Sequence, residues 1–221
     1  MTDPSPDLPP PPRCEIRPGV WLDARLALWL ARARILVVAD LHWGYAHSHR
    51  VRGNLLPAWG DADIEARLLA LIADYAPAEM IWLGDSLHTI AGQETAGRFL
   101  QRAPVPITLI CGNHDLRWPV AKDCRTAVRD SFFLHHGDLD LPVPPGLTEV
   151  IGHHHPAFSW HDGAGGRLKL PALVASARRF VLPAFSPWAA GAPWRPALAG
   201  EEVFAISAKR IFTVPPPGGH K

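Results

Sequence analysis

Five apolar runs in this chain each end in residues that can bind a metal ion. The runs are RILVVAD, EMIWLGD, PITLICGNHD, SFFLHHGD and LTEVIGHHH. The carboxylate, amide and imidazole groups at their ends suit divalent manganese, iron or zinc, and none of these terminal residues is a cysteine. Glycine, which permits sharp backbone turns, adjoins the polar residues in most of the runs. Taken singly, each motif is also typical of an ordinary turn, so the inference depends on all five together.

The apolar runs have the length and the β-branched content of buried strands. GVWLD and RLALWL precede them as expected antiparallel strands, and RFVLPAF, EVFAI and RIFTV follow as later strands. In open α/β sheets, ligands bind beyond the carboxyl ends of the strands. We therefore expect the terminal Asp, Asn and His residues to gather at one rim of an α/β fold that has a substantial antiparallel part late in the chain.

Two segments between these strands carry a helical pattern. Residues 61–76 place apolar side chains on one stripe, with Asp61 or Asp63 as the expected N-cap. The stripe consists of Ile64, Leu68, Leu71, Ile72 and Tyr75. A shorter helix is expected around QETAGRFLQ. Each of the two helices leads into one of the strands that carry candidate ligands.

Together and in this order, the motifs D-x-H, G-D, G-N-H-D, H-G and G-H-x-H are highly specific. The set covers residues 40–155 and resembles the calcineurin-like metallophosphoesterase superfamily. This resemblance implies a metallophosphoesterase β-sandwich flanked by helices, in α/β/β/α layers, which holds two divalent metal ions roughly 3.5–4 Å apart. Manganese (Mn2+) is the expected metal, with iron or zinc as alternatives.

The resemblance also implies a role for each ligand position. The first metal would take Asp40, His42 and His155, the second would take Asn113, His136 and His153, and Asp85 would bridge the two. His136 is preferred to His135 because it directly precedes Gly137, as in the family motif. His154 matches a variable position and receives no role. Alternate side chains of an extended backbone share one side, so only its two outer neighbours would face the metals. Pro156 would then stop further strand pairing.

Phosphoester hydrolysis by a metal-bound hydroxide is the reaction that the resemblance implies. Bridging metals lower the pKa of a bound water toward about 7, so no protein nucleophile is needed. His114 would stabilise charge on the phosphoryl group or protonate the leaving oxygen, with Asp115 orienting its imidazole. His88 could contact substrate or metal-bound water, and an ordinary surface histidine is the alternative. The remaining histidines expected to be solvated are His47, His49 and His161.

A closer resemblance extends over roughly residues 20–190. VVADLHWGYAHSHRVRGNLLPAWGDADIEARLLALI, WLGDSLH, GHHHPA and RRFVLPAF are similar to the ligase-associated DNA damage response endonucleases, the PdeM subfamily. This implies a manganese-dependent phosphodiesterase or endonuclease in DNA repair, functionally associated with an ATP-dependent DNA ligase, a helicase and an exonuclease. Tyr45 and the HGD motif depart from the subfamily pattern at positions that would contact substrate.

DNA is the expected partner, and Trp43 and Arg52 are the candidate contacts besides His88. Trp43 could stack on an unpaired base near the metal rim, and Arg52 could contact phosphate. Further arginines that could contact phosphate are Arg32, Arg34, Arg50, Arg178 and Arg179. The formal net charge of +1 does not itself favour nucleic acid. A phosphatase or phosphodiesterase for a small nucleotide and a catalytically silent scaffold are the alternatives.

One domain is expected over residues 14–214, because 221 residues with 48% hydrophobic content can form a single core. The proline-rich residues 1–13 are expected to form a disordered tail, and residues 215–221 a flexible one. No stretch reaches the roughly 18 apolar residues of a membrane helix, and no signal-peptide pattern opens the sequence, so a cytoplasmic location is expected. Three widely spaced cysteines are expected to be reduced thiols.

Overall fold

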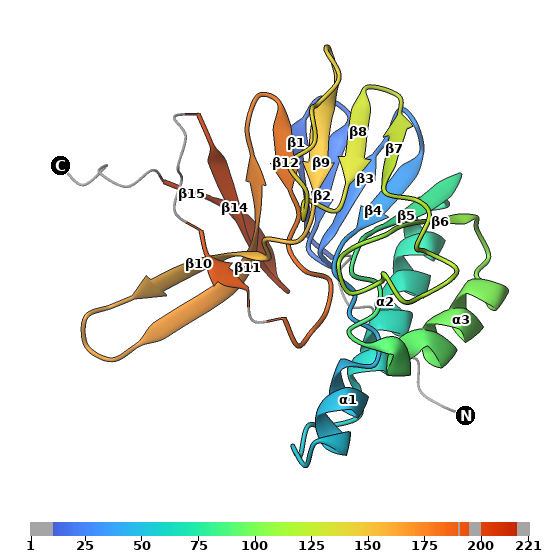
Figure 1. Cartoon of the computed structure of the whole chain (residues 1–221). Coiled ribbons are helices and arrows are strands. Elements are labelled where there is room, and N and C mark those ends of the chain that lie inside the picture. The colour runs from blue at the N-terminus through green and yellow to red at the C-terminus, as the bar shows by residue number, and fades with distance from the viewer. Residues whose placement is uncertain (1–10, 190, 195–199, 216–221) are drawn as a thin grey trace, which may run out of the picture.

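Two β-sheets pack face to face, and two helices cover the outer face of the first sheet (Figure 1). This computed structural model describes residues 11–189, 191–194 and 200–215. The α/β class and the sandwich of two sheets expected from the sequence are therefore confirmed. Within the described part of the chain, helices cover only the outer face of the first sheet, since no helix follows residue 102 there.

The first sheet has the strand order β1-β2-β3-β4-β5-β6. Its strands are β1 (Arg13–Arg17), β2 (Val20–Asp23), β3 (Ala27–Leu30), β4 (Ile35–Val38), β5 (Glu79–Leu83) and β6 (Ile107–Ile110). β1 to β4 form an antiparallel meander, whereas β4, β5 and β6 are parallel neighbours. The carboxyl ends of these parallel strands consequently meet at one edge of the sheet.

The second sheet has the order β13-β10-β11-β12-β9-β8-β7, with β14 paired to β11 and β15 paired to β14. Its strands are β7 (Thr126–Arg129), β8 (Phe132–His135), β9 (Thr148–Ile151), β10 (Pro156–His161), β11 (Arg167–Ala175), β12 (Arg179–Val181), β13 (Ala192–Pro193), β14 (Glu202–Ser207) and β15 (Arg210–Val214). β8, β9 and β12 are parallel neighbours, so this sheet also brings strand ends together. The hairpin of β10 and β11 projects from the body (Figure 1).

Helices α2 (Gly60–Tyr75) and α3 (Gln93–Arg102) pack on the first sheet, and the short 3-10 helix η1 (Ile90–Gly92) precedes α3. The apolar stripe expected on α2 is confirmed, since Ile64, Leu68, Leu71 and Ile72 are buried. The sequence did not predict α1 (Tyr45–Val51), a short helix that follows the first ligand motif and projects from the body (Figure 1).

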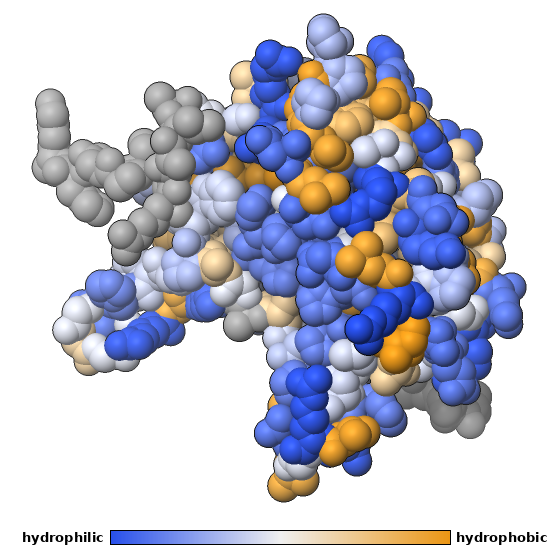
Figure 2. All heavy atoms as spheres, in the orientation of Figure 1, coloured by the Kyte–Doolittle hydropathy of each residue, from blue (hydrophilic) through white to orange (hydrophobic). Residues whose placement is uncertain are grey.

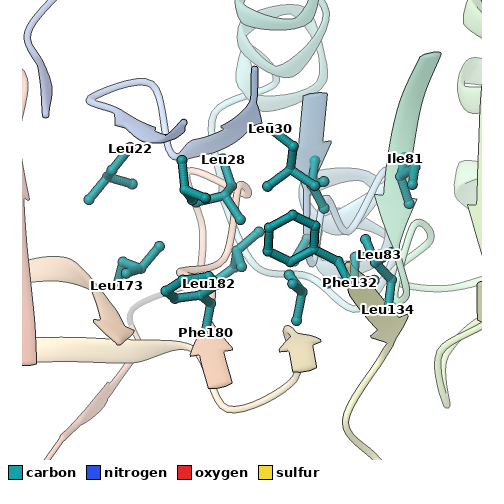
Figure 3. Close-up of a cluster of buried hydrophobic side chains, with 14 of the residues drawn as sticks. Leu22, Leu28, Leu30, Ile81, Leu83, Phe132, Leu134, Leu173, Phe180 and Leu182 are labelled. Carbon is teal, nitrogen blue, oxygen red and sulfur yellow. The ribbon is translucent and has the colours of Figure 1, made fainter. Parts of the chain in front are cut away.

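Strand alternation divides the apolar side chains of the first sheet between two cores. In β4, Ile35 and Val37 face the second sheet, whereas Leu36 and Val38 face α2 and α3. The core between the sheets joins Leu28, Leu30 and Leu83 of one sheet to Phe132, Phe180 and Leu182 of the other (Figure 3). Because both faces of the first sheet are buried at its parallel strands, β4, β5 and β6 are largely apolar up to the residues that leave the sheet.

Two local features differ from the expectation. Asp61 does not cap α2, which begins at Gly60; its carboxylate instead accepts the backbone N–H of Gly44 (3.1 Å) and so holds the start of α1. Pro156 does not end strand pairing but begins β10, a position where a strand tolerates the missing N–H of proline. Residues 162–166 form the turn between β10 and β11.

The chain ends also bear on the expected boundaries. β1 begins at Arg13, and the backbone N–H of Ala24 donates to the carbonyl of Pro12 (2.9 Å). Residues 1–10 and 216–221 of the expected tails lie outside the described residues. Among the described helices, none is long and apolar enough to cross a membrane. Cys14, Cys111 and Cys124 are free thiols.

Candidate metal centre

The expected ligands leave the ends of neighbouring strands from both sheets. They are Asp40 and His42 after β4, Asp85 after β5, Asn113 after β6, His136 after β8, and His153 and His155 after β9. Backbone hydrogen bonds join these loops beyond the ends of the strands. The N–H of Asp40 donates to the carbonyl of Gly84 (3.1 Å), that of His42 to Asp85 (3.0 Å), and that of Gly152 to His136 (3.0 Å). The ligand loops are thus fixed relative to one another by their own backbones.

Several ligand residues adopt a left-handed backbone. Nine non-glycine residues of the described chain have positive φ, and five of the nine are expected ligands: Asp40, His42, Asp85, His153 and His155. Asp and His tolerate this region better than most residues, but each instance still costs on the order of 1–3 kcal/mol and such strain concentrates at functional sites. The extended backbone expected around His154 is therefore wrong. His153 (φ 65°) and His155 (φ 44°) face the centre because both turn left-handed after β9.

Glycines let the ligand loops approach closely. A Cβ at Gly112 would lie 2.3 Å from the backbone nitrogen of Asp85, and one at Gly152 would lie 2.6 Å from Oδ2 of Asp40. Real Cβ atoms do not approach other heavy atoms so closely. The glycines that flank the ligand motifs are thus required by contact between loops, as well as by turn geometry.

Asp40, His42 and His155 form the first ligand group, and one possible ligand atom from each lies within 4.8 Å of the others. Oδ1 of Asp40 is 3.1 Å from Nε2 of His155. These two atoms and Nδ1 of His42 are buried and have no hydrogen-bond partner among the described residues. Buried polar atoms are normally paired, and a cation among these three groups would satisfy them. The first ligand set expected from the sequence therefore fits a divalent metal.

Asp85, His136 and His153 form the second ligand group under the same distance limit. Nε2 of His136 lies 3.1 Å from Nδ1 of His153, 3.2 Å from Oδ1 of Asn113 and 3.3 Å from Oδ1 of Asp85. Four side chains from both sheets thus direct nitrogen or oxygen atoms to one place. All four are members of the expected ligand set, and a mixed N/O set without thiolate suits manganese, iron or zinc.

Asp85 is positioned to interact with both groups. Its Oδ1 faces His136, and its charge also acts on His42 of the first group. Burial raises the pKa of Asp85, but the hydrogen bond and the charge of His136 outweigh this and lower the pKa to about 2. The carboxylate is consequently ionised at neutral pH, as a metal ligand must be. Its role as the bridge between two metals stays a prediction.

The imidazoles of the two groups differ in their proton affinity. Burial lowers the pKa of His42 to about 4, so this ligand is neutral and ready to bind metal at neutral pH. Burial also opposes charge on His136, but the hydrogen bond to Asp85 and the charges of Asp40 and Asp85 raise its pKa to about 9. A metal that enters the second group therefore has to displace a proton from His136.

The neighbouring histidines face away from the centre. Nε2 of His135 lies 2.8 Å from Oε1 of Glu149, so the geometry favours His136 over His135 as the ligand. His154 is exposed and contacts the ring of Trp194, and it belongs to neither ligand group, as expected.

The expected pairing of Asp115 with the imidazole of His114 is wrong. The carboxylate of Asp115 is fully buried and accepts backbone N–H groups of Ser86 (3.0 Å), Leu87 (2.9 Å) and Gly112 (3.1 Å). Asp115 thus joins the loop after β5 to the loop after β6, because its side chain points into the protein from the turn. Burial raises the pKa of Asp115, against the effect of these three donors.

The orientation of His114 comes from the backbone instead. Nδ1 of His114 lies 2.8 Å from the carbonyl oxygen of His88, and a carbonyl only accepts, so Nδ1 carries a proton. Nε2 then faces the centre, 3.9 Å from Oδ2 of Asp85. His88 also contributes its side chain, since His42, His88 and His114 form a third group of converging ligand atoms. Nδ1 of His88 is buried and unpaired among the described residues.

The remaining candidate DNA contacts are of three kinds: buried, exposed, or already paired within the protein. Trp43 is fully buried against Trp82 and Phe99, so the expectation that it stacks on a base is wrong. Arg52 is exposed at the end of α1. Three other candidate arginines already hold protein partners: Arg32 pairs with Asp130, Arg34 donates to the carbonyl of Ala76, and Arg179 pairs with Glu149.

Comparisons with known proteins agree with this site. Residues 33–175 match the family model described as calcineurin-like phosphoesterase. The crystal structure of the nuclease MPE of Pseudomonas putida is similar, with a TM-score of 0.71 and 27% sequence identity, over 92% of this chain and 100% of that chain. No curated protein sequence matches the chain.

Proposed function

The chain belongs to the calcineurin-like phosphoesterase family, and we propose that it is a phosphodiesterase or endonuclease that cleaves DNA. Metal-dependent phosphoester hydrolysis follows from the family and from the similarity to a nuclease. The proposal adds the diester bond, DNA as the substrate and manganese as the metal. One observation carries it: two groups of Asp, Asn and His side chains converge beside an imidazole, His114, that the backbone orients.

Each residue has a defined part in this reaction. Two divalent cations bound by the ligand groups would neutralise charge on the phosphate and lower the pKa of a bound water to about 7. Asp40 and Asp85 supply the carboxylates that hold positive charge in a buried place. His114 presents Nε2 to the scissile group, and in its doubly protonated form it could give the Nε2 proton to the leaving oxygen while Nδ1 keeps its hydrogen bond to the carbonyl of His88.

The accessibility of the centre supports a large substrate. Asn113 and His114 are exposed although the carboxylates beside them are buried. A chain of nucleotides could therefore pass across the centre with its phosphate on the metals. The neighbouring structure is that of a nuclease, which agrees with this preference. A role in DNA repair, membership of the PdeM subfamily and association with a DNA ligase, a helicase and an exonuclease rest on the sequence resemblance.

The proposal is tested by hydrolysis of bis-p-nitrophenyl phosphate, p-nitrophenyl phosphate and single-stranded, nicked and duplex DNA in the presence of manganese. Asp85→Ala and His114→Ala are compared with His161→Ala, a matched control at an exposed hairpin histidine. We expect diester and DNA cleavage by the wild type and by the control, and losses of about 100-fold or more in the other two variants. Turnover of the monoester alone would exclude DNA and favour a small-molecule phosphatase.

A further inference from the structure

Beside the metal centre, four aromatic rings and a basic segment form one continuous surface. We infer that this surface binds unpaired bases of the nucleic-acid strand whose phosphate lies at the metal centre. The rings belong to Tyr45, His49, Trp59 and Trp188 and are called the ring platform below. The inference rests on the proposed function and deepens it, because it identifies single-stranded nucleic acid as the substrate class and locates its bases.

The ring platform continues directly from the candidate catalytic residues. The rings of His114 and His88 stack with centroids 5.5 Å apart, and His88 lies 4.4 Å from Tyr45. Tyr45 is nearly parallel to Trp188, at an interplanar angle of 10° and a distance of 6.3 Å, and Trp188 lies 4.9 Å from Trp59. A strand held at the centre would therefore meet ring after ring as it left the metals.

Residues 44–60 carry three of the four rings, and this segment is fixed at its start. A Cβ at Gly44, directly before α1, would lie 2.6 Å from the Cα of Gly92, so α1 begins in backbone contact with η1. Asp61 fixes the same point through the N–H of Gly44. Beyond this anchor α1 projects from the body, where strongly hydrophilic and hydrophobic side chains lie together on its surface (Figures 1 and 2).

The charge of this segment suits phosphate. Residues 44–60 contain two arginines, Arg50 and Arg52, and no Asp or Glu. Both arginines are exposed, and neither forms an ion pair with a described residue. Burial lowers the pKa of the His88 imidazole, and the charges of His114 and His49 lower it further. The charge of Arg52 adds to this effect, so Arg52 lies close to His88. The next acidic side chains along the chain, Asp61 and Asp63, are engaged with Gly44 and with Arg67.

The exposure of the rings points to a ligand that stacks. Trp59 is 51% exposed although it lies against Trp188, so one large aromatic face remains open to solvent. Proteins that bind single strands combine exposed aromatic rings with a basic path for the backbone, as this surface does. Duplex DNA keeps its bases inside the helix and cannot stack on such rings. An apolar protein partner would instead use the aliphatic side chains of the segment, above all Leu55, which is 98% exposed.

The experiment measures how strongly a short oligothymidylate, or a duplex of the same length, inhibits hydrolysis of bis-p-nitrophenyl phosphate with manganese present. We expect Trp59→Ala to raise the inhibition constant of the single strand roughly 5- to 150-fold, the range for loss of one base–aromatic stack. Trp59→Phe should retain most of the affinity because it keeps a ring. Leu55→Ala is the matched control from the same segment and should not change the inhibition constant.

Three outcomes would overturn the inference: an unchanged constant in Trp59→Ala, an equal loss in Leu55→Ala, or an equal loss for the duplex. The second of these would indicate general apolar docking. A wild-type enzyme that hydrolyses the small diester without inhibition by oligothymidylate would refute the ring platform and leave the hydrolytic centre standing. A wild type that does not hydrolyse the small diester would refute the proposed function itself.

Discussion

Replacement of Asp115 by asparagine distinguishes a structural role from a catalytic one. The carboxylate accepts three backbone N–H groups, one through Oδ1 from Leu87 and two through Oδ2 from Ser86 and Gly112. The best orientation of the asparagine amide keeps two of these bonds, without their charge, and places its NH2 group against the third donor. Because a hydrogen bond to a charged group contributes about 1.5–3 kcal/mol, we expect a loss of about 2–4 kcal/mol in unfolding free energy.

Thermal unfolding of the metal-free protein measures this loss. For a domain of this size 1 kcal/mol corresponds to about 2–4 °C, so Tm should fall by roughly 5–15 °C. Glu94→Gln is the control, because Glu94 forms only an exposed pair with Arg98 and should change Tm by less than about 2 °C. The pH dependence of the residual activity should keep its shape, since Asp115 does not contact the imidazole of His114. An unchanged Tm with a shifted pH profile would refute this reasoning.

Three further predictions concern the metal centre. Metal binding at pH 7 should release more protons than at pH 10, because the pKa of His136 is raised to about 9; calorimetry in buffers of different ionisation enthalpy measures this release. The stability that the proton of His136 gives the metal-free protein should be present below pH 6.5 and lost as pH rises through 9, which thermal unfolding would show. Gly152→Ala should abolish metal binding or folding because its Cβ would meet Asp40, whereas Gly97→Ala, with nothing within 4 Å, should stabilise the helix by up to about 1 kcal/mol in thermal unfolding. His135→Ala should lower Tm and leave the metal content by elemental analysis unchanged, whereas His136→Ala should lose one metal.

The chemistry of the site was predictable from the sequence because ligand types and strand patterns are local. Each apolar run ends in polar residues just beyond a strand, so Asp40, Asp85 and His136 were marked by their position after a strand. His153 and His155 do lie in the two converging groups, although the extended backbone given as the reason for choosing them was wrong. A left-handed backbone depends on contacts between loops, and no pattern in a single segment reports it.

Side-chain direction within the turns was not predictable from the sequence. Asp115 follows His114 directly and could have oriented it, but the turn directs one side chain outward and the other into the protein. Trp43 follows a ligand motif and is nevertheless core, whereas Trp59 and Trp188 meet in the ring platform only through tertiary contacts. Arginines gave no reliable guide either, because partners from distant parts of the chain, such as Asp130 for Arg32 and Glu149 for Arg179, decide which of them are free.

Anomalous diffraction from crystals soaked in manganese tests the central claim most directly. We predict two peaks roughly 3.5–4 Å apart. One should lie among Asp40, His42 and His155, the other among Asn113, His136 and His153, with Asp85 in contact with both. A single peak, a peak beside His135 or Asp115, or no peak at all in protein that hydrolyses the diester would contradict the account.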